Sequence, residues 1–81
     1  MTVNTSTLEV LSWTRISNGS ETVSMQVLSS EGITIVDADS APSPDVRGRI
    51  YGGGAEVVIT PPTMAWVRPL GDSAWIVVDR R

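Results

Sequence analysis

Short runs of alternating apolar and polar residues occupy most of this chain, and turn residues separate them. In the clearest run, 22–28, Val23, Met25 and Val27 fall on one face and polar residues fall on the other. No window sustains the 3.6-residue apolar period of an amphipathic helix. The pattern predicts an all-β fold, a small antiparallel β-sandwich or barrel of six to seven short strands. We expect strands within 8–16, 22–28, 33–36, 46–51, 55–60, 64–68 and 74–79.

The turn signal around Gly19 predicts that the first two strands form a hairpin. A three-residue loop with a left-handed Gly19 sets Trp13 opposite Val23 and Arg15 opposite Glu21. This register matches apolar with apolar and charge with countercharge, so we prefer it to a two-residue loop. It leaves a second apolar face on the first strand that another sheet, a bulge or a partner chain must cover: Leu8, Val10 and Ile16.

The last two strands are expected to form a second hairpin across 69–73. A two-residue turn at 71–72 would set Arg68 opposite Trp75, where a guanidinium lying over an indole stabilises by about 0.5–1 kcal/mol. If all five residues loop out, Val67 faces Trp75 instead. The sequence alone leaves both registers open.

One domain is expected over 8–81, preceded by a polar N-terminal arm, 1–7. The most polar segment, 37–45, holds two prolines and is predicted to be a loop. Three consecutive glycines at 52–54 mark a joint or tight turn. The longest apolar stretch, 74–78, is far too short to span a membrane, so no membrane partner is expected.

Composition removes most catalytic chemistry from consideration. The 81 residues include no Lys, His or Cys. This excludes the usual zinc sites, Cys or His nucleophiles, a disulfide framework and a Walker A loop. The net charge of −3 argues against a general nucleic-acid binder. We therefore expect a protein that is not an enzyme and uses no cofactor.

Two clusters of charge are candidate binding sites. Asp37, Asp39 and Asp45 suggest a cation loop, but the EF-hand pattern is not completed, and a solvated acidic loop with no metal is expected. Arg47 and Arg49 share a predicted strand face with Tyr51, a weak form of the signal for phosphate or RNA. The alternative is that these arginines pair with Glu56 or with acidic groups of a partner, and nucleic acid is not expected.

A chain this short, with no disulfide or evident metal, is often completed by association with other chains. Its aromatic residues are three Trp and one Tyr, and Trp is a common interface anchor. The alternative is that all three Trp are core residues. The candidate interface residues are therefore the apolar second face, the aromatic residues and the strand arginines: Leu8, Val10, Trp13, Arg47, Arg49, Tyr51, Trp66, Arg68 and Trp75. The expected partners are other copies of the chain and other proteins.

The whole chain has a characteristic general composition. It is small, its strands are rich in Ser, Thr, Val and Gly, and it has a polar arm and closing segments such as 64–68 and 74–78. In this it resembles the small all-β virion proteins of tailed bacteriophages, the capsid decoration (cement) and head–tail adaptor proteins. The resemblance implies a non-catalytic virion protein that binds the major capsid protein, and it carries over no individual residue. The alternatives are a neck, tail or fibre adaptor, and a small ligand- or carbohydrate-binding module that uses exposed tryptophans.

Overall fold

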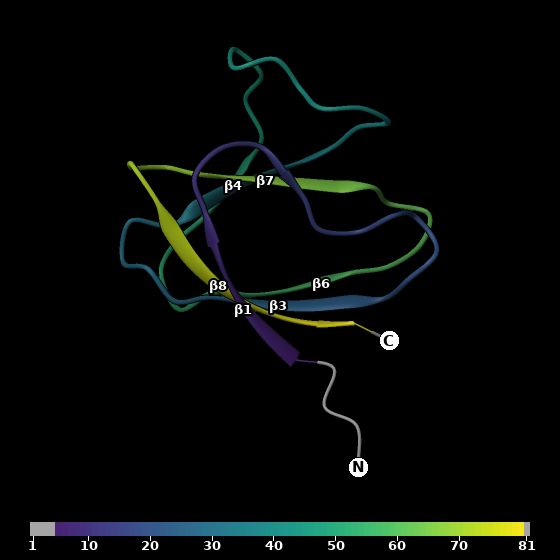
Figure 1. Ribbon diagram of the computed structural model, residues 1–81, viewed down its shortest axis with the longest axis horizontal. Helices are drawn as coiled ribbons and strands as arrows, with labels where there is room; N and C mark the ends of the chain where they lie inside the picture. Colours follow the sequence, from purple (N-terminus) through teal and green to yellow (C-terminus); the bar gives the residue numbers. More distant parts are fainter. Residues whose placement is uncertain (1–4, 81) are drawn as a thin grey trace.

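The computed structural model describes residues 5–80, which form eight β-strands in two four-stranded antiparallel sheets (Figure 1). The expected all-β class is confirmed, with eight strands in place of six to seven. No helix among the described residues has the length and apolar character to cross a membrane. The first sheet has the order β1 (Thr5–Val10), β8 (Ala74–Arg80), β3 (Val23–Val27), β6 (Glu56–Ile59). The second has the order β2 (Thr14–Arg15), β7 (Ala65–Pro69), β4 (Ile33–Asp37), β5 (Arg49–Tyr51).

The extra strand arises because the expected first strand, 8–16, is two strands in different sheets. The chain leaves the first sheet after Val10, crosses through 11–13, where Leu11 is 66% exposed, and enters the second sheet as β2. Of the expected N-terminal arm, residues 5–7 belong to β1 and pair with 77–79 of β8. The rest of the arm, 1–4, lies outside the described residues.

The predicted first hairpin is wrong. β3 pairs with β8 and β6, and Arg15 lies opposite Trp66 of β7. Glu21 is 3.9 Å from the Arg80 guanidinium instead. The turn itself is present, since Gly19 has the expected left-handed conformation (φ 88°). This turn carries the chain from one sheet to the other. The same turn residues would also suit a hairpin within one sheet, so the local sequence does not distinguish the two cases.

The predicted last hairpin is also wrong, because β7 and β8 belong to different sheets. Val67 lies opposite Thr14 and Ile35, and Trp75 lies opposite Glu9. Among the eight described strands, only β4 and β5 are both consecutive in the chain and hydrogen-bonded neighbours in a sheet.

The core lies between the two sheets and takes alternate residues from nearly every strand. It includes the apolar second face predicted for the first strand, with Val10 and Ile16 buried and Leu8 partly buried against them. The other sheet therefore covers this face, and no partner chain is needed there. The buried apolar residues are Val10, Ile16, Val23, Met25, Val27, Ile33, Ile59, Ala65, Val67, Ala74, Ile76 and Val78.

The two long sides of the sandwich-like arrangement differ. On one side, the edge strands β1 and β2 are joined directly by residues 11–13. On the other side, the edge strands are β5 and β6, joined at one end by the turn 52–55. This second side contains a cleft.

Candidate functional site

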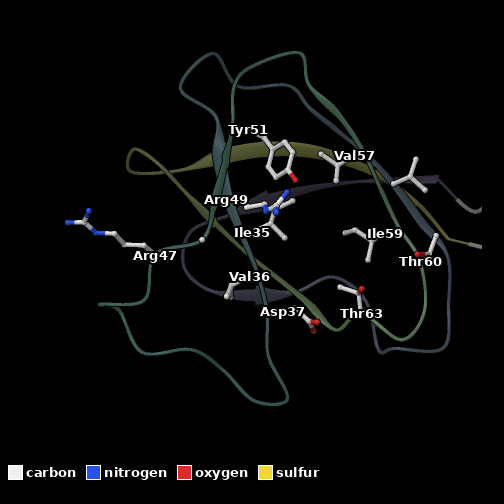
Figure 2. A pocket seen from close by; sticks show the side chains of 12 residues that line it. Ile35, Val36, Asp37, Arg47, Arg49, Tyr51, Val57, Ile59, Thr60 and Thr63 are labelled. Carbon is white, nitrogen blue, oxygen red and sulfur yellow. The ribbon is translucent and has the colours of Figure 1, made fainter.

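A cleft of about 760 Å³ lies between β5 and β6 on the open side of the two sheets (Figure 2). Volumes of this size are typical of ligand-binding sites. Its walls come from both sheets and from the connection after β6. The lining residues are Ile35, Val36, Asp37, Arg47, Gly48, Arg49, Tyr51, Val57, Val58, Ile59, Thr60 and Thr63.

The alternation of β5 determines which side chains reach the cleft. Arg49 lies opposite Ile35, and Tyr51 lies opposite the fully buried Ile33. Because directly paired residues share a face of a sheet, Arg49 and Tyr51 point toward the other sheet. Ile50, between them, points outward and is 68% exposed. The strand thus contributes one guanidinium and one phenol to the cleft.

Gly48 sets the position of β5 against β4. A Cβ at Gly48 would collide with the backbone carbonyl of Ile35, with the carbonyl carbon only 2.7 Å away. The close backbone approach therefore requires glycine at this position. It holds Arg49, the next residue, at the rim of the cleft.

Two arginines and one aspartate line the cleft: Arg47, Arg49 and Asp37. Within residues 5–80, neither the Arg47 guanidinium nor the Arg49 guanidinium has a hydrogen bond or an ion pair. The alternative of pairing with Glu56 is not found among these residues, since Glu56 lies opposite Gln26 on the outward face of the first sheet. The Asp37 carboxylate accepts a hydrogen bond from the Met64 amide (2.9 Å). Figure 2 shows Arg47 extending away from the cleft, whereas Arg49 lies among its apolar residues.

Apolar side chains from both sheets line the cleft floor. Ile35 of β4 and Val57 of β6 are half-buried and pack against the core, and Ile59 is 5% exposed. Sequence analysis singled out Arg47, Arg49 and Tyr51 by a shared strand face but missed these apolar partners. Their alternation on 55–60 was visible, but the position of that strand beside 46–51 was not. β5 begins only at Arg49, so the placement of Arg47 on this strand is wrong.

Three other predicted interface residues hold the long loop between β4 and β5. The indole N–H of Trp66 donates to the carbonyl of Ala38 (2.9 Å), and that of Trp13 donates to Ser43 (3.1 Å). The Arg68 guanidinium donates to the Pro44 carbonyl (2.7 Å). It lies over the Trp13 ring at 5.0 Å, so the cation–π partner of Arg68 is Trp13 and not Trp75.

The remaining predicted interface residues lie on the first sheet. Leu8 and Val10 face the interior, as described above. Trp75 is 46% exposed, and its partner across the strand pair is Glu9. Trp75 therefore stands on the outward face of this sheet, away from the cleft.

The acidic loop shows no grouping suited to a metal ion. Among the described residues, no cluster of three or more Asp, Glu, His or Cys side chains is close enough to hold one. Asp37 closes β4 and lines the cleft, whereas Asp39 and Asp45 are exposed in the loop that follows.

Comparison with protein-family models, with curated proteins and with solved structures finds no significant match to this chain. The candidate site therefore stands on its own geometry.

Proposed function

We propose that this chain is a non-catalytic structural protein that binds another protein chain through the cleft between β5 and β6. One observation carries the proposal: a cleft with an apolar floor lies open between the free edges of β5 and β6, and it bears the Arg49 guanidinium, which has no partner among residues 5–80. Unpaired strand edges are templates for pairing with another chain, and apolar clefts supply the buried area that binding needs.

The setting that we propose is a virus particle, in which the chain decorates or stabilises the capsid and its partner is the major capsid protein. Support comes from the resemblance to small all-β virion proteins and from the absence of Lys, His and Cys. A binding surface distributed over strand edges suits a protein that holds a larger assembly together. A neck, tail or fibre adaptor would use the same surface at lower copy number.

The test is co-sedimentation of the purified chain with assembled shells of the virus that encodes it. We expect the chain to sediment with the shells, with hundreds of copies per particle for a decorating protein and a small ring multiple for an adaptor. Absence of the chain from purified particles, and failure of added chain to bind them, would refute the virion role.

A carbohydrate-binding module is the second candidate, and one observation favours it. Trp75 is 46% exposed, so its ring is available for stacking on a sugar. Trp13 and Trp66 are half-buried and hold the β4–β5 loop instead. Quenching or a shift of tryptophan fluorescence on addition of a glycan, lost in Trp75→Ala, would favour this function over capsid binding.

A further inference from the structure

We propose that the occupant of the cleft is an extended segment of the partner protein that pairs with the free edge of β6 and places an acidic side chain against Arg49. This inference rests on the proposed function, because it names the chemistry of the partner that the same cleft would take. The chain would then bind by strand addition, in which main-chain hydrogen bonds supply affinity and alternate side chains supply specificity.

The edge of β6 is suited to strand addition. β6 pairs with β3 on one side, and no other described strand pairs with it on the other. Its sequence, Glu-Val-Val-Ile, is rich in β-branched residues and contains no proline or lysine. Edge strands that avoid pairing with other chains are usually protected by proline or lysine, by a bulge or by a covering loop. Val58 is 64% exposed, so the outer face of this strand is not covered at that position.

The two faces of β6 dictate the side chains of an added strand. Side chains in an added strand would alternate between the cleft and the outer surface. Those on the inner face would lie beside Val57 and Ile59, across from Ile35 of the other sheet. Apolar, β-branched residues fit this inner face. Those on the outer face would lie beside Val58 and can be polar or apolar.

Charge complementarity selects an acidic residue among the inward positions. Arg49 comes from the opposite sheet into the same cleft, and no described carboxylate pairs with it. A carboxylate is the side chain that a guanidinium binds most strongly, through two parallel hydrogen bonds. The expected ligand is therefore a segment of about five to seven residues, the usual length of a strand, with one Asp or Glu among alternate β-branched residues.

The experiment selects random decapeptides by mRNA display against the immobilised full chain, in parallel with Arg49→Gln and Arg15→Gln. Arg15 is the matched control because it is exposed on β2, at the opposite side of the second sheet, and also lacks a partner within 5–80. The peptide most enriched on the unmodified chain is then titrated into each ¹⁵N-labelled protein. Dodecanoate, an amphiphile with one carboxylate and no main-chain amides, is titrated as a separate ligand.

We expect enriched peptides to carry an acidic residue in alternation with β-branched residues, and their binding to shift the amide resonances of 56–60. Arg49→Gln is expected to weaken binding of the most enriched peptide by about tenfold, because one charge-assisted contact is lost. Arg15→Gln is expected to change the affinity for this peptide less than twofold. Enrichment without acidic residues, equal affinity of the Arg49→Gln protein, or shifts confined to other strands would overturn the proposal. So would binding of dodecanoate in the cleft with no peptide enriched.

Failure of this inference is distinguishable from failure of the proposed function. If Arg49→Gln and a β6-edge variant, Val58→Pro, still co-sediment fully with shells, the capsid role stands and strand addition at β6 is wrong. If peptides bind β6 in an Arg49-dependent manner but the chain never binds shells, the strand site stands and the capsid role is wrong. The amide spectrum of each variant establishes that it is folded.

Discussion

Arg49 lies directly opposite Ile35 in the β4–β5 pair, so a guanidinium occupies the face of the sheet that otherwise carries the apolar core. Its position at the edge strand keeps it exposed to solvent, and it has no partner within the described residues. A charge held on the inward face without a partner contributes little to folding. We therefore assign it to binding.

This assignment predicts that Arg49→Gln leaves the free energy of unfolding within about 0.5 kcal/mol of the unmodified chain. Urea denaturation followed by tryptophan fluorescence measures it. Arg68→Gln is the contrasting variant, because it loses both the Trp13 stacking contact and the bond to the Pro44 carbonyl, and we expect it to be less stable. A large destabilisation by Arg49→Gln would mean that Arg49 supports the fold.

Ser17 joins the turn after β2 to the start of β7. Its hydroxyl donates to the Thr63 carbonyl and accepts from the Ala65 amide, each at 2.9 Å, in a side chain that is 2% exposed. Ser17→Ala removes the partner of the buried Ala65 amide and of the partly buried Thr63 carbonyl, and we predict a loss of about 1–3 kcal/mol in urea denaturation. Ser20→Ala, at an exposed hydroxyl of the same turn, is the control and is expected to cost far less. Equal effects would contradict the bridging role of Ser17.

Thr34 is a buried residue whose hydroxyl forms no hydrogen bond with the described residues. It is 4% exposed, and its Oγ1 has no hydrogen-bond partner among residues 5–80. Thr34→Val keeps the shape and removes the unpaired group, so we predict a gain of about 1 kcal/mol and a higher Tm. Thr14→Val is the control with the opposite sign, because the Thr14 hydroxyl donates to the Ser12 carbonyl. A loss of stability in Thr34→Val would show that the hydroxyl has a partner.

The indole of Trp66 holds the β4–β5 loop near the strand from which the loop leaves. Trp66→Phe removes the hydrogen bond to the Ala38 carbonyl while keeping an aromatic ring in place. We predict faster hydrogen–deuterium exchange in 38–46 with unchanged protection of β3 and β8, and a loss of about 1 kcal/mol in stability. Trp75→Phe, which alters an exposed ring on the other sheet, is expected to leave the loop unchanged. Unchanged exchange in Trp66→Phe would contradict the anchoring role.

The strands were predictable because alternation and turn residues are local. The run 22–28 contains β3, and Val23, Met25 and Val27 are buried as the pattern requires. Strand pairing was not predictable, because most connections cross between sheets and a turn residue such as Gly19 reverses the chain equally well in either case. The stacking of Arg68 on Trp13 could not be foreseen for the same reason.

The candidate site was predictable in part. The shared face of Arg49 and Tyr51 follows from the two-residue period of a strand and is present in β5. The apolar wall from Val57 and Ile59 depends on which edge strands of the two sheets lie side by side, which is a property of topology. Long-range placement of this kind leaves no signal in a single sequence.

The central claim is that partners bind on the β5–β6 side, and thiol protection tests it most directly because the chain contains no cysteine. Val58→Cys and Leu11→Cys place a thiol at two positions of nearly equal exposure in the unmodified chain. Val58 of β6 is 64% exposed, and Leu11, in the connection between β1 and β2 on the other side of the molecule, is 66% exposed. Each is treated with a maleimide in the free chain and in the chain bound to assembled shells. We predict that binding protects the thiol at 58 and leaves the thiol at 11 reactive. Protection at 11 with full reactivity at 58 would contradict the account.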